Sequence, residues 1–447
     1  MAEWTNWAKT VRHPDLAKVY DPKNLAMLKD NVAEAVENGW KLRAVGSGHA
    51  WSNLGLPPGR QGAVILTDRL QGFEVLKRPS GNEPGLVEVE AGIKIKRLTE
   101  LLFDADLALP NIGDANPQGL GGAIATSTHG SGVGPGLGSF SEAIEGMTIV
   151  TVDEQGRVQD RILQDEQLKA GRVARGQLGV VYKVKLAVID NYYLDHVRTI
   201  VEFRKEETGL PALLRDNRHV EYWFYPYTEP GMAERIVRNV VDSTKVRNPL
   251  GPFERLRIKF ASWYVNRLGR RSPERLPNLF RKRVPRLREI RRQGPWHKIL
   301  LGSSNIWREV VKTYTMEYQF AYEHLWEAFG ELEKSIALAE RNGVYVAAPI
   351  QFRFTKKSER SFLSHLSFEP TVSFSISFHT NHRGAHKFLP DVEERLIKLG
   401  GKPHWGKMYY TRPAEDPRFE AVREQLDPTG VFAYEQPLPE REDYQNP

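Results

Sequence analysis

The chain has 447 residues, of which 40% are apolar and 10% aromatic, so it can fill about two or three hydrophobic cores and is not disordered in composition. It contains no cysteine, which excludes disulfides, thiolate metal sites, cysteine nucleophiles and cofactors bonded through sulfur. The formal net charge is +7. The amino terminus lacks a signal-peptide pattern and no apolar run is long enough to cross a membrane, which predicts a soluble cytoplasmic protein.

The first part of the chain, residues 1–190, alternates between helical and strand patterns, which predicts one α+β domain. Helical spacing occupies 21–38 and 95–107. Short β-type runs occupy 41–45, 63–66 and 86–91, a hairpin pattern occupies 145–160, and a strand over 176–190 closes the domain. Between them lies a glycine-dense segment, 111–140, that lacks the periodicity of a helix.

Residues 191–405 predict a second α+β domain, and residues 406–447 a carboxyl-terminal segment that returns to the first. The expected strands are 196–204, 219–226, 344–354 and 371–379, and the expected helices are 318–342 and 389–400. A basic, proline-punctuated insert at about 245–300 interrupts this domain.

The insert carries fifteen Lys and Arg residues between Arg255 and Lys298, against two acids. Aromatic residues such as Trp263, Tyr264 and Trp296 are interleaved with these cations. This mixture suits an anionic membrane surface, and it suits equally well a solvated pair of basic helices. No nucleic-acid-reading module accompanies the insert, so nucleic acid is not an expected partner.

Two loops of the first domain are rich in small residues. VGSGHA places Gly46 and Gly48 before His49, where glycine can take positive φ and expose backbone N–H groups to a phosphate. It is neither a Walker loop nor G-x-G-x-x-G, because Trp51 occupies the third glycine position. The second loop is GGAIATSTHGSGVG. Two such loops suit a long ligand with a pyrophosphate and a ring system, whereas flexible-linker glycine is the alternative.

Five motifs in order resemble one family: GSGHA, GGAIATSTHGSG, TIVTVDEQGRV, GQLGVVYKVKL, and PHWGK followed by LDPTGVF. The chain resembles the aldonolactone and alditol oxidases of the vanillyl-alcohol-oxidase class of flavoproteins, over most of its length except the insert. The resemblance implies an α+β, two-domain flavoprotein. Its FAD-binding domain consists of two small α+β subdomains, and its cap or substrate domain has an antiparallel sheet with flanking helices.

The resemblance implies FAD as the cofactor, bonded covalently through His49. The family usually has serine after this histidine, where this chain has Ala50. The backbone of Gly46, Ser47 and Gly48 is expected to hold the pyrophosphate, and Gly179 and Val180 to lie near the adenine. The full set of expected cofactor contacts is Val45, Gly46, Ser47, Gly48, His49, Ala50, Trp51, Gly113, Gly121, Gly122, Ala123, Thr126, His129, Gly130, Gly132, Gly179, Val180 and Lys407. No metal is expected.

The substrate side is expected in the second domain, where the family has a Glu-x-Arg pair on a strand facing the flavin. The matching strand here is APIQFRFT, so Gln351 and Arg353 share one face. Arg353 can stabilise negative charge, but the amide of Gln351 cannot accept a proton. If a base is needed, His379 is the first candidate and Lys407 the second.

These inferences predict an oxidoreductase in which a CH–OH group of a sugar-derived alcohol or lactone gives hydride to flavin N5, with reoxidation by oxygen or another acceptor. Gln351 leaves two alternatives open. One is membrane-associated oxidation of a lipid-linked or hydrophobic alcohol, with the protein peripheral on the inner face of the membrane. The other is a protein that keeps FAD for structure and binds a partner through the insert.

Overall fold

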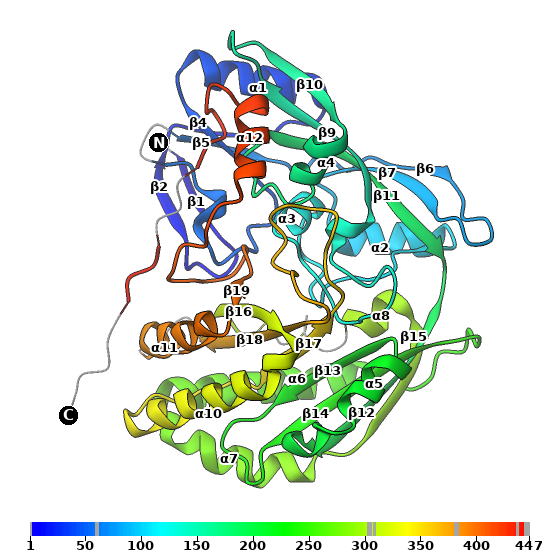
Figure 1. The fold of residues 1–447 in the computed structure, drawn as a ribbon, viewed down its shortest axis with the longest axis vertical. Coiled ribbons are helices and arrows are strands. Elements are labelled where there is room, and N and C mark those ends of the chain that lie inside the picture. Colours follow the sequence, from blue (N-terminus) through cyan, green and yellow to red (C-terminus); the bar gives the residue numbers. More distant parts are fainter. Residues whose placement is uncertain are drawn as a thin grey trace.

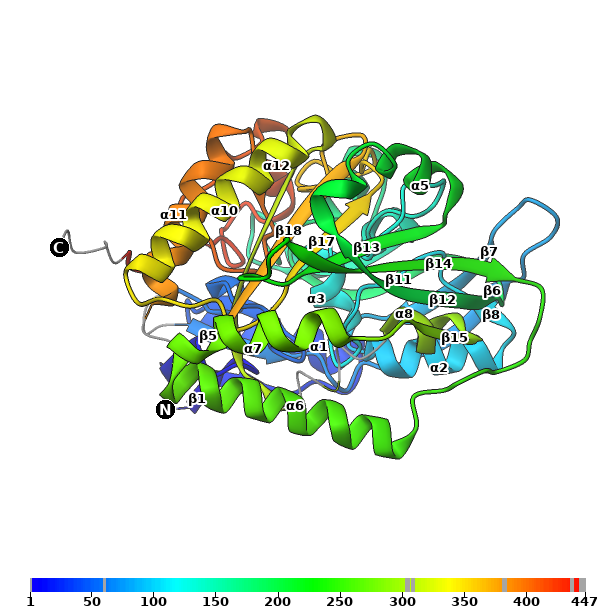
Figure 2. The same cartoon turned by 90° about the horizontal axis from the view of Figure 1, so that it is seen from below.

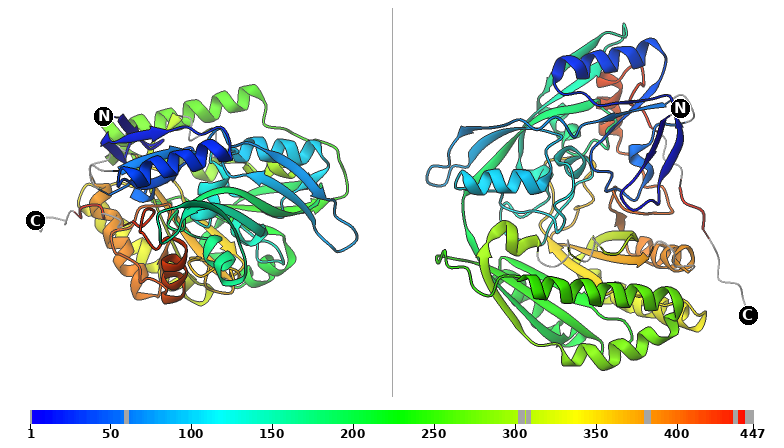
Figure 3. Two further views of the ribbon diagram at one scale, coloured as in Figure 1. Left: turned by 90° about the horizontal axis from the view of Figure 1, so that it is seen from above. Right: turned by 180° about the vertical axis from the view of Figure 1, so that it is seen from behind.

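The computed structural model describes residues 2–58, 62–301, 306, 310–379, 384–434 and 438–441. Its strands fall into an amino-terminal unit, which we define by strands β1–β11, and a cap unit, defined by strands β12–β19. Figure 1 shows the two units one above the other, with the red helix α12 lying against the amino-terminal unit. Figure 3 shows the same arrangement from above and from behind.

The amino-terminal unit begins with a hairpin and a three-stranded parallel sheet in the order β3-β5-β4. Helix α1 connects two strands of this sheet and buries Leu28, Val32 and Ala35, which recur at helical spacing. The side chain of Asn24 caps α1 by accepting a hydrogen bond from the backbone N–H of Met27. The elements are β1 (Ala2–Thr5), β2 (Arg12–Leu16), β3 (Lys18–Tyr20), α1 (Leu25–Glu37), β4 (Lys41–Val45) and β5 (Gly62–Leu66).

A larger antiparallel sheet, in the order β10-β9-β11-β7-β6 with β8 paired to β11, completes this unit. Its strands are β6 (Phe73–Lys77), β7 (Gly85–Glu90), β8 (Leu107–Ala108), β9 (Ile144–Val152), β10 (Val158–Leu163) and β11 (Val180–Asp190). Its helices are α2 (Ile95–Asp104), α3 (Leu120–Ala125), α4 (Asp165–Gly171) and α12 (Pro417–Leu426). The predicted hairpin at 145–160 is confirmed as β9 and β10.

A buried arginine ties the end of the described chain to this unit. Arg43 on β4 donates from Nε to the carbonyl oxygen of Leu54 at 2.8 Å. Its Nη1 donates to the carbonyl oxygens of Gly176 and Phe432, each at 3.0 Å, and its Nη2 donates to that of Arg175. Because a buried guanidinium must find acceptors for its N–H groups, these contacts fix four separate segments against one another.

The cap unit is built on one eight-stranded antiparallel sheet in the order β15-β12-β14-β13-β17-β18-β16-β19. Its strands are β12 (Tyr193–Glu202), β13 (His219–Phe224), β14 (Met232–Val241), β15 (Ile290–Pro295), β16 (Thr313–Ala321), β17 (Ile350–Thr355), β18 (Thr371–His379) and β19 (Lys402–Pro403). Its helices are α5 (Leu210–Asp216), α6 (Pro252–Arg271), α7 (Leu276–Arg283), α8 (Trp296–Leu301), α10 (Leu325–Arg341) and α11 (Ala385–Lys398).

The two faces of this sheet have opposite character because side chains alternate along each strand. One face carries Phe320, Phe352 and Phe374, and it packs on apolar residues of α10 such as Phe329. The other face carries polar residues that are nevertheless buried: Glu221, Thr315, Glu317, Gln319, Gln351, Arg353 and Ser373. Buried polar groups need hydrogen-bonding partners, so a binding site is expected beside this face of the sheet.

The basic insert forms α6 and α7, which lie along the outer side of the cap unit (Figure 2). Within the described part of the chain, no helix combines the length and the apolar character that crossing a bilayer requires.

Several sequence-based expectations about elements were wrong. The strand expected over 344–354 begins only at Ile350, as β17. The helix predicted over 318–342 starts only at Leu325, because β16 ends at Ala321 and its polar face contains Glu and Gln, which are good helix formers. Strands β14 and β15 were not expected. The glycine-dense segment contains the short helix α3, which small residues allow to approach neighbouring backbone closely.

Candidate active site

A cleft separates the glycine-rich loops of the amino-terminal unit from the polar face of the cap sheet. It contains about 1390 Å³ of space not occupied by protein atoms. The loop after β4, helix α3 with the loop that follows it, and the segment before β11 form one side. Glu317, Arg353 and His404 of the cap unit line the other side.

Most residues expected to contact the cofactor line this cleft: Val45, Gly46, Ser47, Gly48, His49, Ala50, Trp51, Gly121, Gly122, Ala123, Thr126, His129, Gly179 and Lys407. Among the described residues, Gly113, Gly130, Gly132 and Val180 do not line it. Gly130 and Gly132 serve close packing instead, since a Cβ on either would lie within 2.7 Å of a backbone oxygen, of Ile112 or of Arg218.

The first loop brings backbone, rather than side chains, to the cleft. Gly48 has φ of +62°, a conformation that favours glycine. A Cβ on Gly46 would lie 3.7 Å from the Cα of Gly119, so the two glycine-rich loops approach each other closely. The ammonium of Lys94 donates to the hydroxyl of Ser47 at 2.8 Å and fixes this loop from outside.

The second glycine-rich loop leaves free space on its side of the cleft. A Cβ added to Gly122 on α3 would have no other atom within 4 Å, so it would project into open space beside the cleft that Gly122 lines. Two buried polar atoms of lining residues, Oε1 of Gln118 and Nε of Arg175, have no hydrogen-bond partner in the part of the chain that the structure describes. A long ligand with a flat ring and several polar groups would fill this space and pair these atoms, so the residues fit FAD.

We expect Gly122→Val to fold normally and to lose most of its bound FAD, because the added side chain has room in the protein but occupies the cleft. The ratio of flavin to protein after purification, from the visible and ultraviolet absorption, measures this loss. Gly251→Val is the matched control, since its Cβ also has free space but lies at the start of α6. Full flavin content in Gly122→Val would contradict this placement of the cofactor.

His49 follows the first loop and lines the cleft. Its ring stacks on Trp7, with the ring centroids 5.0 Å apart and the planes 23° apart. The ammonium of Lys312, from the cap unit, lies 3.8 Å from the centroid of the Trp7 indole. The indole therefore fixes the orientation of the imidazole at the wall of the cleft.

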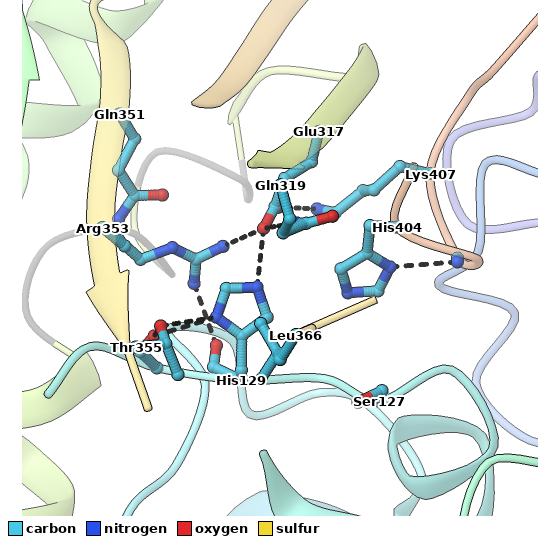
Figure 4. A network of polar contacts seen from close by, with 12 residues as sticks. Ser127, His129, Glu317, Gln319, Gln351, Arg353, Thr355, Leu366, His404 and Lys407 are labelled. Atoms are coloured by element: carbon cyan, nitrogen blue, oxygen red, sulfur yellow. Dashed lines mark hydrogen bonds and ion pairs between the residues drawn. The ribbon is translucent and has the colours of Figure 1, made fainter. Parts of the chain in front are cut away.

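Figure 4 shows a buried ionic network at the cap side of the cleft. A carboxylate oxygen of Glu317 accepts from Nη2 of Arg353 at 2.7 Å and lies 2.8 Å from Nε2 of His129. Nη1 of Arg353 donates to the carbonyl oxygen of His129 at 2.9 Å. Burial alone would raise the pKa of Glu317, but the charge of Arg353 and the contact with His129 hold that pKa well below its ordinary value.

One nitrogen of Arg353 is left without a partner. Its Nε is buried and has no hydrogen-bond partner among the described residues, while Nη1 and Nη2 each donate one hydrogen bond. The strand places this side chain on the polar face, where it lines the cleft. An unpaired guanidinium N–H beside a cofactor cleft can donate to negative charge that develops during a reaction.

Two further histidines, His365 and His404, lie beside His129 with their side chains buried. Burial lowers the pKa of all three imidazoles. Their ring nitrogens lie within 4.8 Å of one another, the spacing of a metal site. His129 uses both its nitrogens, with the carbonyl of Gly130 and with Glu317, so this set does not offer three ligands to a metal.

The remaining predicted residues are divided between the cleft and its surroundings. Lys407 lines the cleft, with its Nζ 3.9 Å from Glu317 and 4.3 Å from the centroid of the Trp51 ring. Gln351 lies in a neighbouring cavity, where its amide donates to Glu221 at 3.4 Å. The backbone of His379 ends β18, opposite Thr313, but its side chain lies outside the described residues.

Glu317, His365 and His404 were missed as site residues. The available signal was the alternation in TYTMEYQFA and TVSFSISFH, where every second residue is polar although both faces are buried. Such alternation usually indicates a strand with one solvated face, so it did not by itself point to a site. The burial of the polar face follows from how the two units pack.

Comparison with known proteins agrees with this geometry. Residues 184–436 match the family model described as D-arabinono-1,4-lactone oxidase, and residues 16–160 match an FAD binding domain. L-Gulono-1,4-lactone dehydrogenase of Mycobacterium tuberculosis is 29% identical over 96% of each chain. D-Arabinono-1,4-lactone oxidase of Kluyveromyces lactis is 23% identical over 90% of this chain and 84% of its own.

Solved structures share the fold. A solvent-stable cholesterol oxidase superposes with a TM-score of 0.77 at 18% identity, covering 96% of this chain and 95% of its own. Cholesterol oxidase from B. sterolicum gives a TM-score of 0.78 at 16% identity. The expected α+β flavoprotein fold of the vanillyl-alcohol-oxidase type is thereby confirmed. The family match spans more than half of the chain, so this protein is an FAD-dependent oxidoreductase that belongs to the D-arabinono-1,4-lactone oxidase family.

Proposed function

We propose that this enzyme oxidises a CH–OH group of a sugar-derived lactone or alcohol to a carbonyl, and that oxygen or another acceptor takes the electrons afterwards. The network of Glu317, Arg353 and His129 at the cap side of the cleft carries this proposal. The relatives named for L-gulono-1,4-lactone and D-arabinono-1,4-lactone support the substrate class. Residues 1–190 with 406–447 would form the FAD-binding domain, and residues 191–405 the substrate domain.

The proposed roles follow from the contacts. Bound FAD would supply the acceptor for the hydride that leaves the carbinol carbon. Arg353, through its unpaired Nε–H, and Lys407 stabilise the negative charge that develops beside them. Glu317 holds Arg353 in place and keeps the net charge of the group low. The carbinol proton needs an acceptor, because the amide of Gln351 cannot serve. His379 is the first proposed residue, and a neutral Lys407 is the second, in which case Lys407 does not act as the charge-stabilising group.

The experiment is to mix the FAD-loaded enzyme anaerobically with each of the two lactones and to record the visible absorption of the flavin. The proposal expects at least one of them, or a related alditol, to bleach the flavin at a saturable rate. A flavin that a chemical reductant bleaches, but that no lactone or alditol in such a panel reduces, would instead support a protein that keeps FAD without oxidising a sugar derivative.

We also propose that His49 bonds covalently to the cofactor, supported by its position at the cleft wall next to the glycine loop. Acid precipitation of the wild-type protein should leave flavin fluorescence in the pellet. In His49→Ala the flavin should move to the supernatant. His324→Ala removes a partly exposed histidine of the cap unit and is the matched control. Flavin in the supernatant of the wild-type protein would rule out the bond.

A specific observation supports peripheral association with an anionic membrane. Helix α6 exposes Phe253, Leu256, Phe260, Trp263 and Tyr264, with exposed fractions between 45% and 74%. At 100° per residue these side chains fall within an arc of about 100°. The helix also contains six Lys or Arg residues and one acid. Aromatic and apolar side chains flanked by cations are the composition of an interfacial helix.

We expect the protein to sediment with vesicles of phosphatidylcholine and phosphatidylglycerol at low salt, and less with phosphatidylcholine alone. Phe260→Ser with Trp263→Ser should weaken this binding. Ile162→Ser is the control, because Ile162 is 71% exposed on β10 of the amino-terminal unit. Equal sedimentation with both kinds of vesicle would contradict membrane association.

A further inference from the structure

A second large cavity lies beneath α6, on the same polar face of the cap sheet. It contains about 1320 Å³ of space not occupied by protein atoms. Ile258 and Ser262, from the inner side of α6, form part of its lining, opposite strands β12, β13, β14 and β17. A single lactone ring in the cofactor cleft would leave this cavity unused.

The two cavities are neighbours. Asp114 borders both of them. On β17, Arg353 lines the cofactor cleft while Gln351, two residues away on the same face, lines the second cavity. Two residues of a strand span about 7 Å. A ligand that reacts beside Arg353 and extends by roughly one sugar ring would therefore reach Gln351 and Glu221.

The polar groups of the second cavity are balanced in charge. Arg238 pairs with Glu221 at 2.8 Å, and Arg198 pairs with Glu234 at 3.4 Å. Arg292 pairs with Glu254 at the edge of α6. Burial, with the nearby arginines, lowers the pKa of His196 to about 2, so this lining residue is neutral. Among the described residues, the lining has no surplus of positive charge, which argues against a phosphate or a carboxylate as its ligand.

Unpaired donors in the lining favour a polar ligand. Nε of Arg198 and Nε of Arg292 are buried and have no hydrogen-bond partner among the described residues. Leaving such donors beneath a purely apolar ligand would cost free energy, whereas hydroxyl oxygens would satisfy them. Trp223 and Tyr225 add aromatic surface on the floor of the cavity. A sugar unit is neutral, carries many hydroxyl groups and has apolar ring faces. It therefore matches the balanced charge, the unpaired donors and the aromatic surface of the cavity.

We propose that the second cavity is a glycosyl subsite, and that the physiological substrate carries a neutral sugar unit linked to the unit that is oxidised. This rests on the proposed function for the chemistry in the cleft, and it adds the size and class of the substrate. The oxidised unit lies beside Arg353, and the linked sugar lies between Gln351 and α6.

The test compares two parent compounds with their glycosides in the FAD-loaded, full-length enzyme: D-glucono-1,5-lactone with lactobiono-1,5-lactone, and D-glucitol with maltitol. We expect kcat/KM for flavin reduction to be about tenfold or more higher for a glycoside than for its parent. Equal values for glycoside and parent in both pairs would overturn the subsite.

Two variants locate the effect. Ser262→Phe fills the cavity from α6 and should lower kcat/KM for the glycoside about tenfold while changing that of the parent much less. Ala261→Phe, at the adjacent and exposed position of α6, is the matched control and should leave both values unchanged.

Trp223→Ala removes aromatic surface without filling the space, and it should raise KM for the glycoside more than for the parent. Equal losses for both compounds would overturn the subsite.

Calorimetric binding of maltitol separates this proposal from the proposed function. If no compound bleaches the flavin but maltitol binds to the wild type and not to Ser262→Phe, the oxidation is wrong and the subsite stands. If D-glucitol or the parent lactone bleaches the flavin and neither glycoside binds, the oxidation stands and the subsite is wrong.

Discussion

Replacing Glu317 with glutamine should slow flavin reduction by about 10²–10³-fold at saturating substrate and should also lower the stability of the cap unit. Glu317 is fully buried and joins Arg353 to His129. Glutamine keeps the shape but removes the one carboxylate among the described residues that forms an ion pair with Arg353. Breaking a buried pair in this way costs about 3–5 kcal/mol, since the remaining charge has no partner.

Glu393→Gln is the matched control for that prediction. Glu393 is also fully buried, on α11, where it accepts from the hydroxyl of Tyr318 and from the backbone N–H of Tyr410. Thermal unfolding should show a loss of stability in both variants, while stopped-flow measurement should show slower flavin reduction only in Glu317→Gln. A variant Glu317→Gln that reduces its flavin at the wild-type rate would remove this residue from the proposed mechanism.

Replacing Arg353 with lysine should reduce the rate of flavin reduction by a similar factor, about 10²–10³-fold. Lysine keeps the positive charge, but a single ammonium cannot reproduce the planar guanidinium, which donates to Glu317 and to the carbonyl of His129 and has Nε unpaired among the described residues. The loss should appear in kcat more than in KM, because the unpaired Nε–H is expected to bind charge that exists only as the reaction proceeds.

Arg172→Lys tests whether any buried arginine would behave in this way. Arg172 is as buried as Arg353, and its guanidinium donates to the carbonyl oxygen of Ile144, outside the residues that line the cleft. We expect an effect on stability there and no change in the reduction rate of the folded enzyme. If Arg353→Lys alters KM alone, Arg353 binds the substrate without assisting the reaction.

The sequence allowed the cofactor side to be predicted in more detail than the substrate side. The first glycine loop is local, so the short stretch from Val45 to Trp51 could be read from the sequence, and all seven residues line the cleft. By contrast, Glu317 on β16 and Arg353 on β17 are 36 residues apart in the sequence, and they meet across β18, the strand that lies between them in the sheet. Their pairing depends on the order of strands in the sheet, which no local pattern specifies.

Gln351 shows a second limit of prediction from the sequence. Alternation correctly placed it on the face of Arg353, yet the structure assigns the two side chains to different cavities. The position of the cavity wall depends on Asp114 and on α6, which come from distant parts of the chain. The insert that was least like the family thus forms the roof of the second cavity, a relation visible only in three dimensions.

The contacts of Arg43 also bear on when the cofactor cleft can form during synthesis of the chain. Its acceptor on Phe432 lies 389 residues further along the chain, and Gly406 and Lys407 of the cleft wall lie nearly as far. At about 5–20 residues per second, a ribosome needs roughly 20–80 s to reach that point after it has made Arg43. The cleft is therefore expected to stay incomplete during most of translation. We expect FAD to bind late in the synthesis of the chain.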